Sequence, residues 1–293
     1  MKNAMKKLLT LMVFVLAACT NSNKESQNSG EVIDFKSKNT VVQSSQMIVL
    51  EKFTADWCAP CKGVAEKYDA LFTNEGLGDN AIMLTYQFSD HFYNSFDSDT
   101  KAFFDGDTEN NHKYDYNPVP MVFKNGQIGE TIDNRMKGKP CPYTDEPTLK
   151  NILGSSKEDY VAPIADYIIQ MNFKNNILEV KITNQSNTNH ENLKLHAMIT
   201  EDGHAYDVAP GTNEQTKFSH AIVKYLGVTN VEATSPGTEQ TITFDFDSIQ
   251  LPIIKWNSGL KSRSIANINV VIFIQNPDTK TILQGAELSL ESE

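Results

Sequence analysis

The chain has 293 residues with 26 lysines and arginines against 37 aspartates and glutamates, which gives a formal net charge of −11. An acidic chain without a basic cluster is poorly suited to bind nucleic acid, and anionic lipid headgroups would repel it. Four cysteines are too few for a disulfide-stapled scaffold. The length suggests one large domain or two ordinary ones.

The N-terminus predicts an export signal over residues 1–18. Lys2, Lys6 and Lys7 precede an apolar run that is too short to span a membrane, as is typical of a secretory signal. The run ends in Leu-Ala-Ala directly before Cys19. This ending resembles a bacterial lipobox, which implies cleavage before Cys19 and diacylation of that residue. The alternative is an ordinary cleaved signal followed by an incidental cysteine.

Residues 19–45 are expected to be the lipidated cysteine and a flexible tether. Residues 20–30 are rich in asparagine and serine and nearly free of apolar side chains, so they cannot bury a core. No later apolar stretch is long enough for a transmembrane helix, which leaves the lipid on Cys19 as the expected membrane anchor.

The next segment predicts a strand, a helix and a second strand. Residues 47–53 form a mostly apolar run typical of a buried strand, and residues 81–88 form another. Between them, Val64, Tyr68 and Phe72 recur at helical spacing. Strand, helix and strand in this order are typical of a βαβ unit, so the two strands should be parallel.

A Cys-Ala-Pro-Cys motif at residues 58–61 lies where this unit turns from strand to helix. Cys58 is therefore expected at the helix N-terminus, where backbone N–H groups and the helix dipole stabilise a thiolate, and Lys62 adds positive charge. Two intervening residues let Cys61 reach the sulfur of Cys58 after one turn. The motif predicts a redox pair.

A zinc site and a purely structural disulfide are the two other interpretations of the motif. A zinc site would need two further ligands at close spacing, and the sequence has neither a second cysteine pair nor a His-x-x-x-His pattern. A purely structural disulfide would close a loop too short to stabilise the fold much. No metal and no cofactor are expected.

Three further elements are expected before residue 156. Residues 89–117 are acidic and rich in aromatic residues, which favours a partly helical insertion over a solvated linker. Apolar runs at 120–124 and 127–132 flank Asn-Gly at 125–126, which predicts a hairpin whose turn residues have positive φ. Residues 145–153 predict a closing helix.

The pattern changes between residues 154 and 162, where we expect a domain boundary. Several short apolar runs without intervening helices predict an all-β, sandwich-like domain over residues 157–293. Its expected strands are residues 177–183, 193–200, 241–247, 268–275 and 282–290. Residues 220–226 fit either a strand or a short helix.

Histidine and tryptophan residues in this region show no pattern of a binding site. The six histidines of the chain have no ligand spacing. His190, His196 and His204 are expected on solvated strand faces, and Trp256 is expected in the core.

At the cysteine motif, the chain resembles the thioredoxin superfamily over residues 46–153. Trp57 and Lys62 flank the cysteines as in thioredoxin. Val-Pro at 119–120 resembles the family's cis-proline loop, which lies against the cysteine pair and helps bind the substrate chain. An ordinary trans proline opening an edge strand is the alternative. The residues that this resemblance implies in substrate binding are Trp57, Pro60, Val119 and Pro120.

Two features depart from the thioredoxin pattern. The insertion over residues 89–117 is foreign to plain thioredoxin and would lie near the substrate. Thioredoxins also carry a buried acid six residues before the first cysteine, where this chain has Lys52 beside Glu51. A lysine there could favour the thiolate of Cys58 but could not accept its proton while charged. Lys52, Glu51 and Lys62 are therefore the residues that could tune the pKa of Cys58.

The layout as a whole resembles the outer membrane protein twenty-eight family of Bacteroidetes lipoproteins. The resemblance rests on the lipobox, the thioredoxin-like domain over residues 46–156, and a β domain that contains Val-Val-Ile-Phe-Ile-Gln-Asn at 270–276. It implies a lipid-anchored protein of the cell envelope, at the outer membrane.

The sequence therefore predicts a membrane-tethered thiol–disulfide oxidoreductase. Cys58 would attack a client disulfide and Cys61 would resolve the mixed disulfide. The expected partners are a protein client with disulfides or thiols, the membrane through the lipid on Cys19, and an upstream redox partner that the sequence does not identify. Cys141 would be an ordinary thiol or would exchange disulfides with the pair. The alternative is a non-enzymatic surface or periplasmic binding lipoprotein that uses the thioredoxin fold as a scaffold.

Overall fold

A computed structural model describes most of the chain between residues 31 and 290. The described residues are 31–32, 39–74, 80–88, 96–105, 119–127, 162–205, 209, 211–251 and 268–290. Several expectations fall outside them: the signal peptide, Cys19, Cys141, Trp256, the closing helix over 145–153 and most of the boundary region over 154–162. No helix in the described part of the chain is long and apolar enough to cross a membrane.

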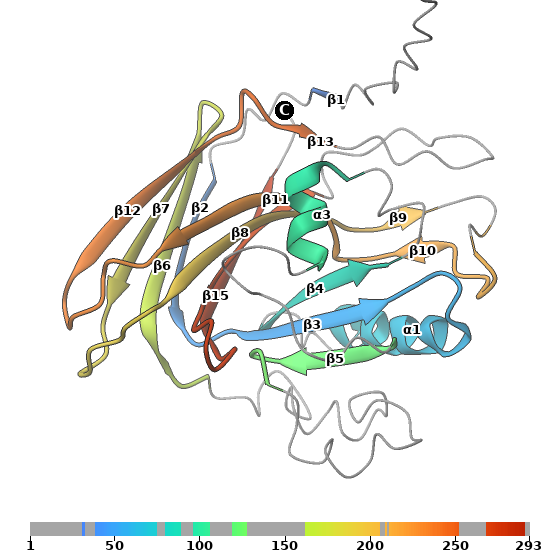
Figure 1. The fold of residues 1–293 in the computed structure, drawn as a ribbon, viewed down its shortest axis with the longest axis horizontal. Coiled ribbons are helices and arrows are strands. Elements are labelled where there is room, and N and C mark those ends of the chain that lie inside the picture. The colour runs from blue at the N-terminus through green and yellow to red at the C-terminus, as the bar shows by residue number, and fades with distance from the viewer. Residues whose placement is uncertain are drawn as a thin grey trace, which may run out of the picture.

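The predicted βαβ unit is present (Figure 1). It consists of β3 (Ile48–Thr54), α1 (Ala59–Asn74) and β4 (Ala81–Gln87). The two strands pair in parallel along their whole length, and every residue in both is buried. A strand that is buried on both faces has no polar face, which is why these runs do not alternate. Val64 and Tyr68 of α1 pack against one face of this pair.

The predicted hairpin turn is also confirmed. β5 (Met121–Lys124) runs antiparallel to β3, and Asn125 and Gly126 follow it with φ angles of 49° and 73°. Asn125 also holds the neighbouring strand, because its backbone N–H donates to the carbonyl oxygen of Val49 and its Oδ1 accepts from the N–H of Val49, each at 2.7 Å. Residues 128–132, expected as the second strand of the hairpin, lie outside the described residues.

The described part of the insertion over 89–117 contains a helix, as expected. α3 (Ser98–Asp105) begins after Asp97, whose Oδ1 accepts a hydrogen bond from the N–H of Thr100 at 2.9 Å. Such a cap satisfies one of the free donors at a helix start. Phe103 of α3 is buried and stacks on Tyr225 with ring centroids 4.1 Å apart. The three phenylalanines in the described part of the insertion, Phe96, Phe103 and Phe104, thus belong to the core.

A seven-stranded sheet joins the thioredoxin-like part to the β-rich region, in the order β15-β14-β8-β11-β4-β3-β5. Its later strands are β8 (Lys194–Glu201), β11 (Ala221–Asn230), β14 (Ile268–Gln275) and β15 (Ile282–Leu290). β11 continues the sheet parallel to β4, where the N–H of Thr85 donates to the carbonyl oxygen of His220 at 2.8 Å. The ranges 46–156 and 157–293 therefore share one sheet and one core.

A second, four-stranded antiparallel sheet has the order β12-β7-β6-β2. Its strands are β12 (Glu239–Asp245), β7 (Ile177–Asn184), β6 (Ile164–Lys174) and β2 (Asn39–Ser45). β6 alternates buried with more exposed residues, so one face of this sheet covers the core. The sheet lies beside β15 (Figure 1), which contacts both β2 and β6. Thioredoxin-like α/β structure followed by a sandwich-like β region is therefore the observed fold.

The expected tether over residues 19–45 ends earlier than predicted. Residues 39–45 form β2, which pairs antiparallel with β6 from Asn39↔Phe173 to Ser45↔Ile164, with an irregularity between Gln43 and Ser45. β-branched residues favour a pleated, half-buried strand, and Val41 packs on the core while its neighbour Val42 is exposed. The polar composition that predicts a tether is confined to residues 20–30. The end of the expected tether, residues 39–45, is a strand of the fold.

Four two-residue strands complete the described elements. They are β1 (Glu31–Val32) with β13 (Gln250–Leu251), and β9 (His204–Ala205) with β10 (Lys217–Phe218). Residues 220–226, which fitted a strand or a helix, belong mostly to β11.

The expectation of a solvated face for His196 was wrong. β8 lies between β11 and β14 and is buried on both faces except at its first residue. His196 has no exposed surface, its Nδ1 lies 3.1 Å from the hydroxyl of Tyr225, and its ring stacks on Phe273 with centroids 4.8 Å apart. Both faces of β8 are covered in this fold, so its alternating sequence does not mark a solvated face.

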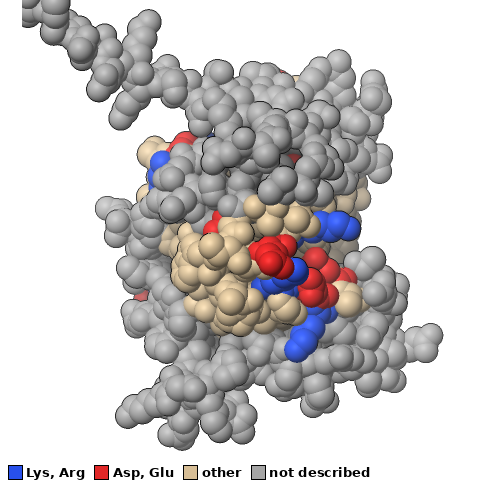
Figure 2. Space-filling model, turned by 90° about the vertical axis from the view of Figure 1, so that its right-hand side faces the viewer, with Lys and Arg blue, Asp and Glu red and all other residues tan. Residues whose placement is uncertain are grey.

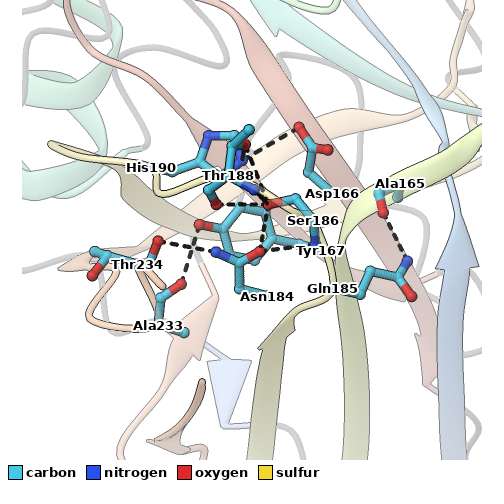
Figure 3. A network of polar contacts seen from close by, with 10 residues as sticks. All are labelled: Ala165, Asp166, Tyr167, Asn184, Gln185, Ser186, Thr188, His190, Ala233 and Thr234. Atoms are coloured by element: carbon cyan, nitrogen blue, oxygen red, sulfur yellow. Dashed lines mark hydrogen bonds and ion pairs between the residues drawn. The ribbon is translucent and has the colours of Figure 1, made fainter. Parts of the chain in front are cut away.

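His190 belongs to a polar network at one end of the four-stranded sheet (Figure 3). Its Nε2 lies 3.5 Å from a carboxylate oxygen of Asp166. In the same network, the hydroxyl of Tyr167 donates to the carbonyl oxygen of Ala233 at 3.2 Å, and burial raises the pKa of Tyr167 to about 12. The amide of Asn184 donates to the carbonyl oxygen of Thr234 at 3.0 Å. These bonds join β6 and β7 to the segment that leads into β12.

The contact of β15 with β3 and β4 can be tested at Gly285. A Cβ at this position would lie 2.7 Å from Cγ2 of Val49 and 3.1 Å from Cδ1 of Ile82. Val49 is fully buried and β-branched, so it cannot easily rotate away. Gly285→Ala should destabilise the protein by about 1–3 kcal/mol in chemical denaturation, as expected for overpacking.

Gly63→Ala is the matched control. Gly63 is exposed in α1, and its added Cβ would have no atom within 4 Å. The change should stabilise the protein by about 0.5–1 kcal/mol, because alanine loses less backbone entropy in a helix. Equal effects of the two changes would contradict the close approach of β15 to β3.

Candidate redox site

Cys58 and Cys61 form a disulfide at the start of α1, with Cα atoms 5.4 Å apart. Cys58 directly precedes the first residue of the helix, and the N–H of Cys61 donates to the carbonyl oxygen of Cys58 at 3.1 Å. Cys58 is 5% exposed, whereas Cys61 has no exposed surface. A thiol that approaches this disulfide from solvent therefore meets Cys58 first.

Apolar residues surround the disulfide. The two cysteines cluster with Ala55, and Phe88 and Val119 pack against them. The peptide bond between Val119 and Pro120 is cis, as predicted from the resemblance to thioredoxin. This loop and the cysteine pair, which lie about sixty residues apart in the chain, are thus in contact. The roles of Val119 and Pro120 in substrate binding stay predictions.

Trp57 and Pro60 lie at the surface beside the pair. Trp57 is 58% exposed, which is unusual for the largest apolar side chain, and Pro60 is also exposed. Figure 2 faces the end of the molecule at which β3 runs into α1. Among the described residues of this face, basic and acidic side chains lie next to one another, beside a larger patch of uncharged residues.

A loop of the β-rich region lies directly on the backbone of the motif. The N–H of Asn213 donates to the carbonyl oxygen of Asp56 at 2.9 Å. Its side-chain Nδ2 donates to the carbonyl oxygens of Ala55 and Cys58, at 3.1 and 3.3 Å. Thr212 adds a weaker bond, from its hydroxyl to the carbonyl oxygen of Trp57 at 3.4 Å. Residues 211–215 thus hold the strand-to-helix turn that presents the cysteines.

Two details show how closely this loop fits the motif. At Gly211, an added Cβ would lie 2.4 Å from the carbonyl oxygen of Asp56, so only glycine allows the approach. Oδ1 of Asn213 accepts from the N–H of Gln215 at 2.9 Å, which turns its Nδ2 toward the motif. The sequence did not indicate Asn213, because its partners lie more than 150 residues away and no local pattern marks such a contact.

The three residues expected to tune the pKa of Cys58 lie in different surroundings. Lys62 is 4.0 Å from Glu214 of the loop. Lys52 is buried with its Nζ 6.0 Å from the ring centre of Tyr68. Burial lowers the pKa of Lys52, and the charges of Asp69 and Asp202 oppose this shift.

Glu51 lies on the opposite face of β3 from Lys52, since successive residues of a strand point to opposite sides. It is fully buried, and its carboxylate accepts a hydrogen bond from the hydroxyl of Tyr86 at 2.9 Å. Whether any of the three residues tunes Cys58 stays a prediction, and the contacts of Lys52 that the structure shows are with groups away from the cysteines.

Comparisons with known proteins agree with this fold. The model of the thioredoxin family matches residues 31–85, so the chain contains a thioredoxin domain. A search of curated proteins finds no match. Among solved structures, HBP35 of Porphyromonas gingivalis aligns with a TM-score of 0.55 at 14% identity, over 85% of this chain and 76% of that one. This likeness shows a shared fold.

Two further structures align less well. A protein of Agrobacterium tumefaciens gives a TM-score of 0.47 at 14% identity, over 86% of this chain and 98% of that one. A domain of the outer membrane lipoprotein Omp28 from Porphyromonas gingivalis gives a TM-score of 0.23 at 13% identity, over 45% of this chain and 93% of that domain.

The role of the loop can be tested with Asn213→Asp. The change keeps the shape of the side chain and the acceptor for Gln215, but it places an oxygen against the carbonyl oxygens of Ala55 and Cys58. The lost bonds and the new repulsion should destabilise the protein by about 1–3 kcal/mol. Alkylation of Cys58 in the reduced protein should become faster, because the loop no longer holds the motif.

Asn230→Asp is the control, because it adds the same charge at an exposed residue whose Oδ1 accepts from Lys194. It should change neither the stability nor the alkylation rate appreciably. Stability is measured by denaturation, and alkylation of Cys58 is timed by mass spectrometry. Equal results for the two variants would contradict a role of the loop over residues 211–215 in holding the motif.

Proposed function

We propose that the protein is a membrane-tethered thiol–disulfide oxidoreductase of the cell envelope. The observation that supports this function best is the Cys58–Cys61 disulfide at the start of α1, in which only Cys58 reaches the surface. The match to the thioredoxin family over residues 31–85, which include the pair, supports a nucleophilic role for Cys58 and a resolving role for Cys61.

The proposed reaction starts from the reduced pair. The thiolate of Cys58 attacks one sulfur of a client disulfide, the client S–S bond breaks, and the other client sulfur leaves as a thiolate. The thiolate of Cys61 then attacks the sulfur of Cys58 in the mixed disulfide and releases the second client thiol. The client gains two electrons, the pair loses two and becomes the disulfide, and a dithiol donor must reduce it again. The same steps run backwards would oxidise a client dithiol.

The position of Cys58 supports its role as the nucleophile. A sulfur at a helix N-terminus lies near unpaired backbone N–H groups and the positive end of the helix dipole, which stabilise a thiolate. In the reduced protein, the pKa of Cys58 should therefore lie below that of a free thiol. Lys62 follows in the first turn of the helix and adds positive charge. The carboxylate of Glu214, 4.0 Å from its Nζ, offsets part of the positive potential of Lys62 at Cys58.

The client is proposed to bind around the exposed edge of the pair. Trp57 and Pro60 offer apolar surface there, and Val119 of the cis-proline loop packs against the cysteine pair. A client chain that docks on these residues would also approach the loop over residues 211–215. This arrangement gives the β-rich region a part in client selection.

The alternative function is a non-enzymatic binding lipoprotein. One observation favours it: the disulfide is nearly buried, and Asn213 fastens the backbone around it. In that case the disulfide would be inert and the β-rich region would provide the binding surface.

Single cysteine variants distinguish these functions. Cys58→Ser should abolish reduction of a model disulfide substrate, because no nucleophile remains. Cys61→Ser should instead accumulate mixed disulfides with clients, because attack occurs without resolution. Non-reducing electrophoresis with mass spectrometry of the trapped species measures both outcomes.

Cys141→Ser is the control and should keep wild-type activity if this cysteine is an ordinary thiol. A wild-type protein without reductase or oxidase activity, whose Cys58 titrates at or above the free-thiol value of about 8.5, would sink the enzyme function in favour of the binding lipoprotein.

The anchor is proposed from the lipobox at residues 16–19. Mass spectrometry of the mature N-terminus should find diacylglycerol on Cys19, and Cys19→Ala should move the protein out of the membrane fraction because the lipid is its proposed anchor. Cleavage at another residue, or unmodified Cys19 in membrane-bound protein, would contradict both the anchor and the proposed outer-membrane location.

A further inference from the structure

Three strands of the seven-stranded sheet bring together Asp202, His220 and Glu287. Asp202 follows the last residue of β8, His220 precedes the first residue of β11, and Glu287 lies in β15. The ligand atoms of the three side chains all lie within 4.8 Å of one another. This cluster is separate from the disulfide, because Asp69 and Phe72 near the other end of α1 border it.

His220 and Asp202 are arranged like two neighbouring ligands of one metal ion. Nδ1 of His220 lies 3.0 Å from Oδ1 of Asp202, yet this buried nitrogen makes no hydrogen bond of acceptable geometry in the described part of the chain. Oδ1 already accepts from the backbone N–H of His220 at 2.6 Å. A cation that both atoms coordinate would satisfy the nitrogen.

A further side chain fixes the orientation of this carboxylate. Nδ2 of Asn269, in β14, donates to Oδ2 of Asp202 at 2.7 Å. Hydrogen bonds of this kind commonly orient metal-ligating carboxylates and raise metal affinity. The carboxylate therefore has one oxygen held by the neighbouring strand and the other directed at His220.

The cluster opens into a cavity of about 320 Å³. This volume holds an ion with several waters, since one water occupies about 30 Å³ in the liquid. The carboxylates of Asp69, Asp202 and Glu287 border the cavity. The positive charge of the buried Lys52 acts on Asp69, Asp202 and His220. The cavity therefore presents an excess of carboxylate oxygens to a cation.

We propose that Asp202, His220 and Glu287 bind a divalent transition-metal ion of the zinc type. One imidazole nitrogen with two carboxylate oxygens suits zinc and its neighbours, whereas calcium and magnesium favour all-oxygen sites. In a tetrahedral site with bonds of about 2.1 Å, two ligand atoms stand about 3.4 Å apart, and Nδ1 of His220 and Oδ1 of Asp202 are already 3.0 Å apart. Side-chain rotation would have to shorten the wider separations in the cluster, which reach up to 4.8 Å.

Such a site leaves at least one coordination position for water or a ligand from the cavity. It would also join β8, β11 and β15 at the place where the β-rich strands meet α1 and β4. An ion that binds the folded state alone stabilises it by mass action, so metal binding should be visible in the thermal stability of the protein as well as in a binding isotherm.

The test uses the mature protein with its Cys58–Cys61 disulfide intact and with Cys141→Ser, so that no thiol of these residues competes for metal. After treatment with a chelator and its removal, zinc chloride is titrated by calorimetry and the melting temperature is followed. We expect one equivalent of zinc and a melting temperature that rises with zinc concentration. Asp202→Asn, Glu287→Gln and His220→Asn should each weaken binding by at least about tenfold, the low end of what loss of even an outer-shell partner causes.

His190→Asn is the matched control, because His190 also lies beside an aspartate but belongs to no three-ligand group among the described residues. It should bind zinc as the parent protein does. Asparagine tolerates the positive φ of 54° at residue 220, which limits damage to the fold in His220→Asn. Circular dichroism of each metal-free variant checks its folding.

X-ray absorption of the zinc-loaded parent protein keeps the proposal testable if a variant fails to fold. It should show one imidazole among oxygen ligands. Absence of zinc binding, binding unchanged in all three ligand variants, a shell without imidazole, or magnesium binding as tight as zinc would each overturn the assignment.

Discussion

The parallel pairing of β3 and β4 is the constraint on which the rest of the structure depends. Both strands are buried on both faces, so each face needs a cover of its own. α1 covers one face through Val64 and Tyr68, and β15 approaches the other so closely that Gly285 has room for no side chain. The β-rich region is therefore half of the environment that a thioredoxin-like unit requires, and the continuous sheet from β15 to β5 follows from this need.

The same constraint explains the surroundings of the cysteine pair. β11 runs parallel to β4 in the sheet, which brings the preceding loop to the end of β3 where the motif begins. Asn213 then donates from its side-chain amide to the carbonyl oxygens of Ala55 and Cys58, which also accept from the backbone N–H groups of Cys58 and Cys61. These bonds fasten the turn that presents Cys58, so the geometry of the redox pair depends on residues from the far part of the chain.

Lys52 is a buried charged residue on the face of β3 toward α1. Lys52 occupies the place where thioredoxins have an acid, and it faces a group of carboxylates from α1 and from the loop after β8. A lysine can stay there because acidic residues that are distant in sequence surround it. Glu51, one residue earlier, points to the other face and meets Tyr86 instead. Where thioredoxins bury an acid, this protein therefore buries a lysine together with nearby carboxylates that stabilise its charge.

Local patterns in the sequence determined the βαβ unit, the cysteine motif at the helix start, the Asn-Gly turn and most strands of the β-rich region. Each depends on residues within a few positions of one another: apolar spacing, turn chemistry and the distance of one helical turn between Cys58 and Cys61. Only the tertiary structure decided which strands share a sheet, that β2 belongs to the fold, and that His196 is buried. It alone placed Asn213 at the motif and joined Asp202, His220 and Glu287. Strand pairing and burial bring together residues 18 to more than 150 positions apart, and no periodicity within a single segment records such contacts.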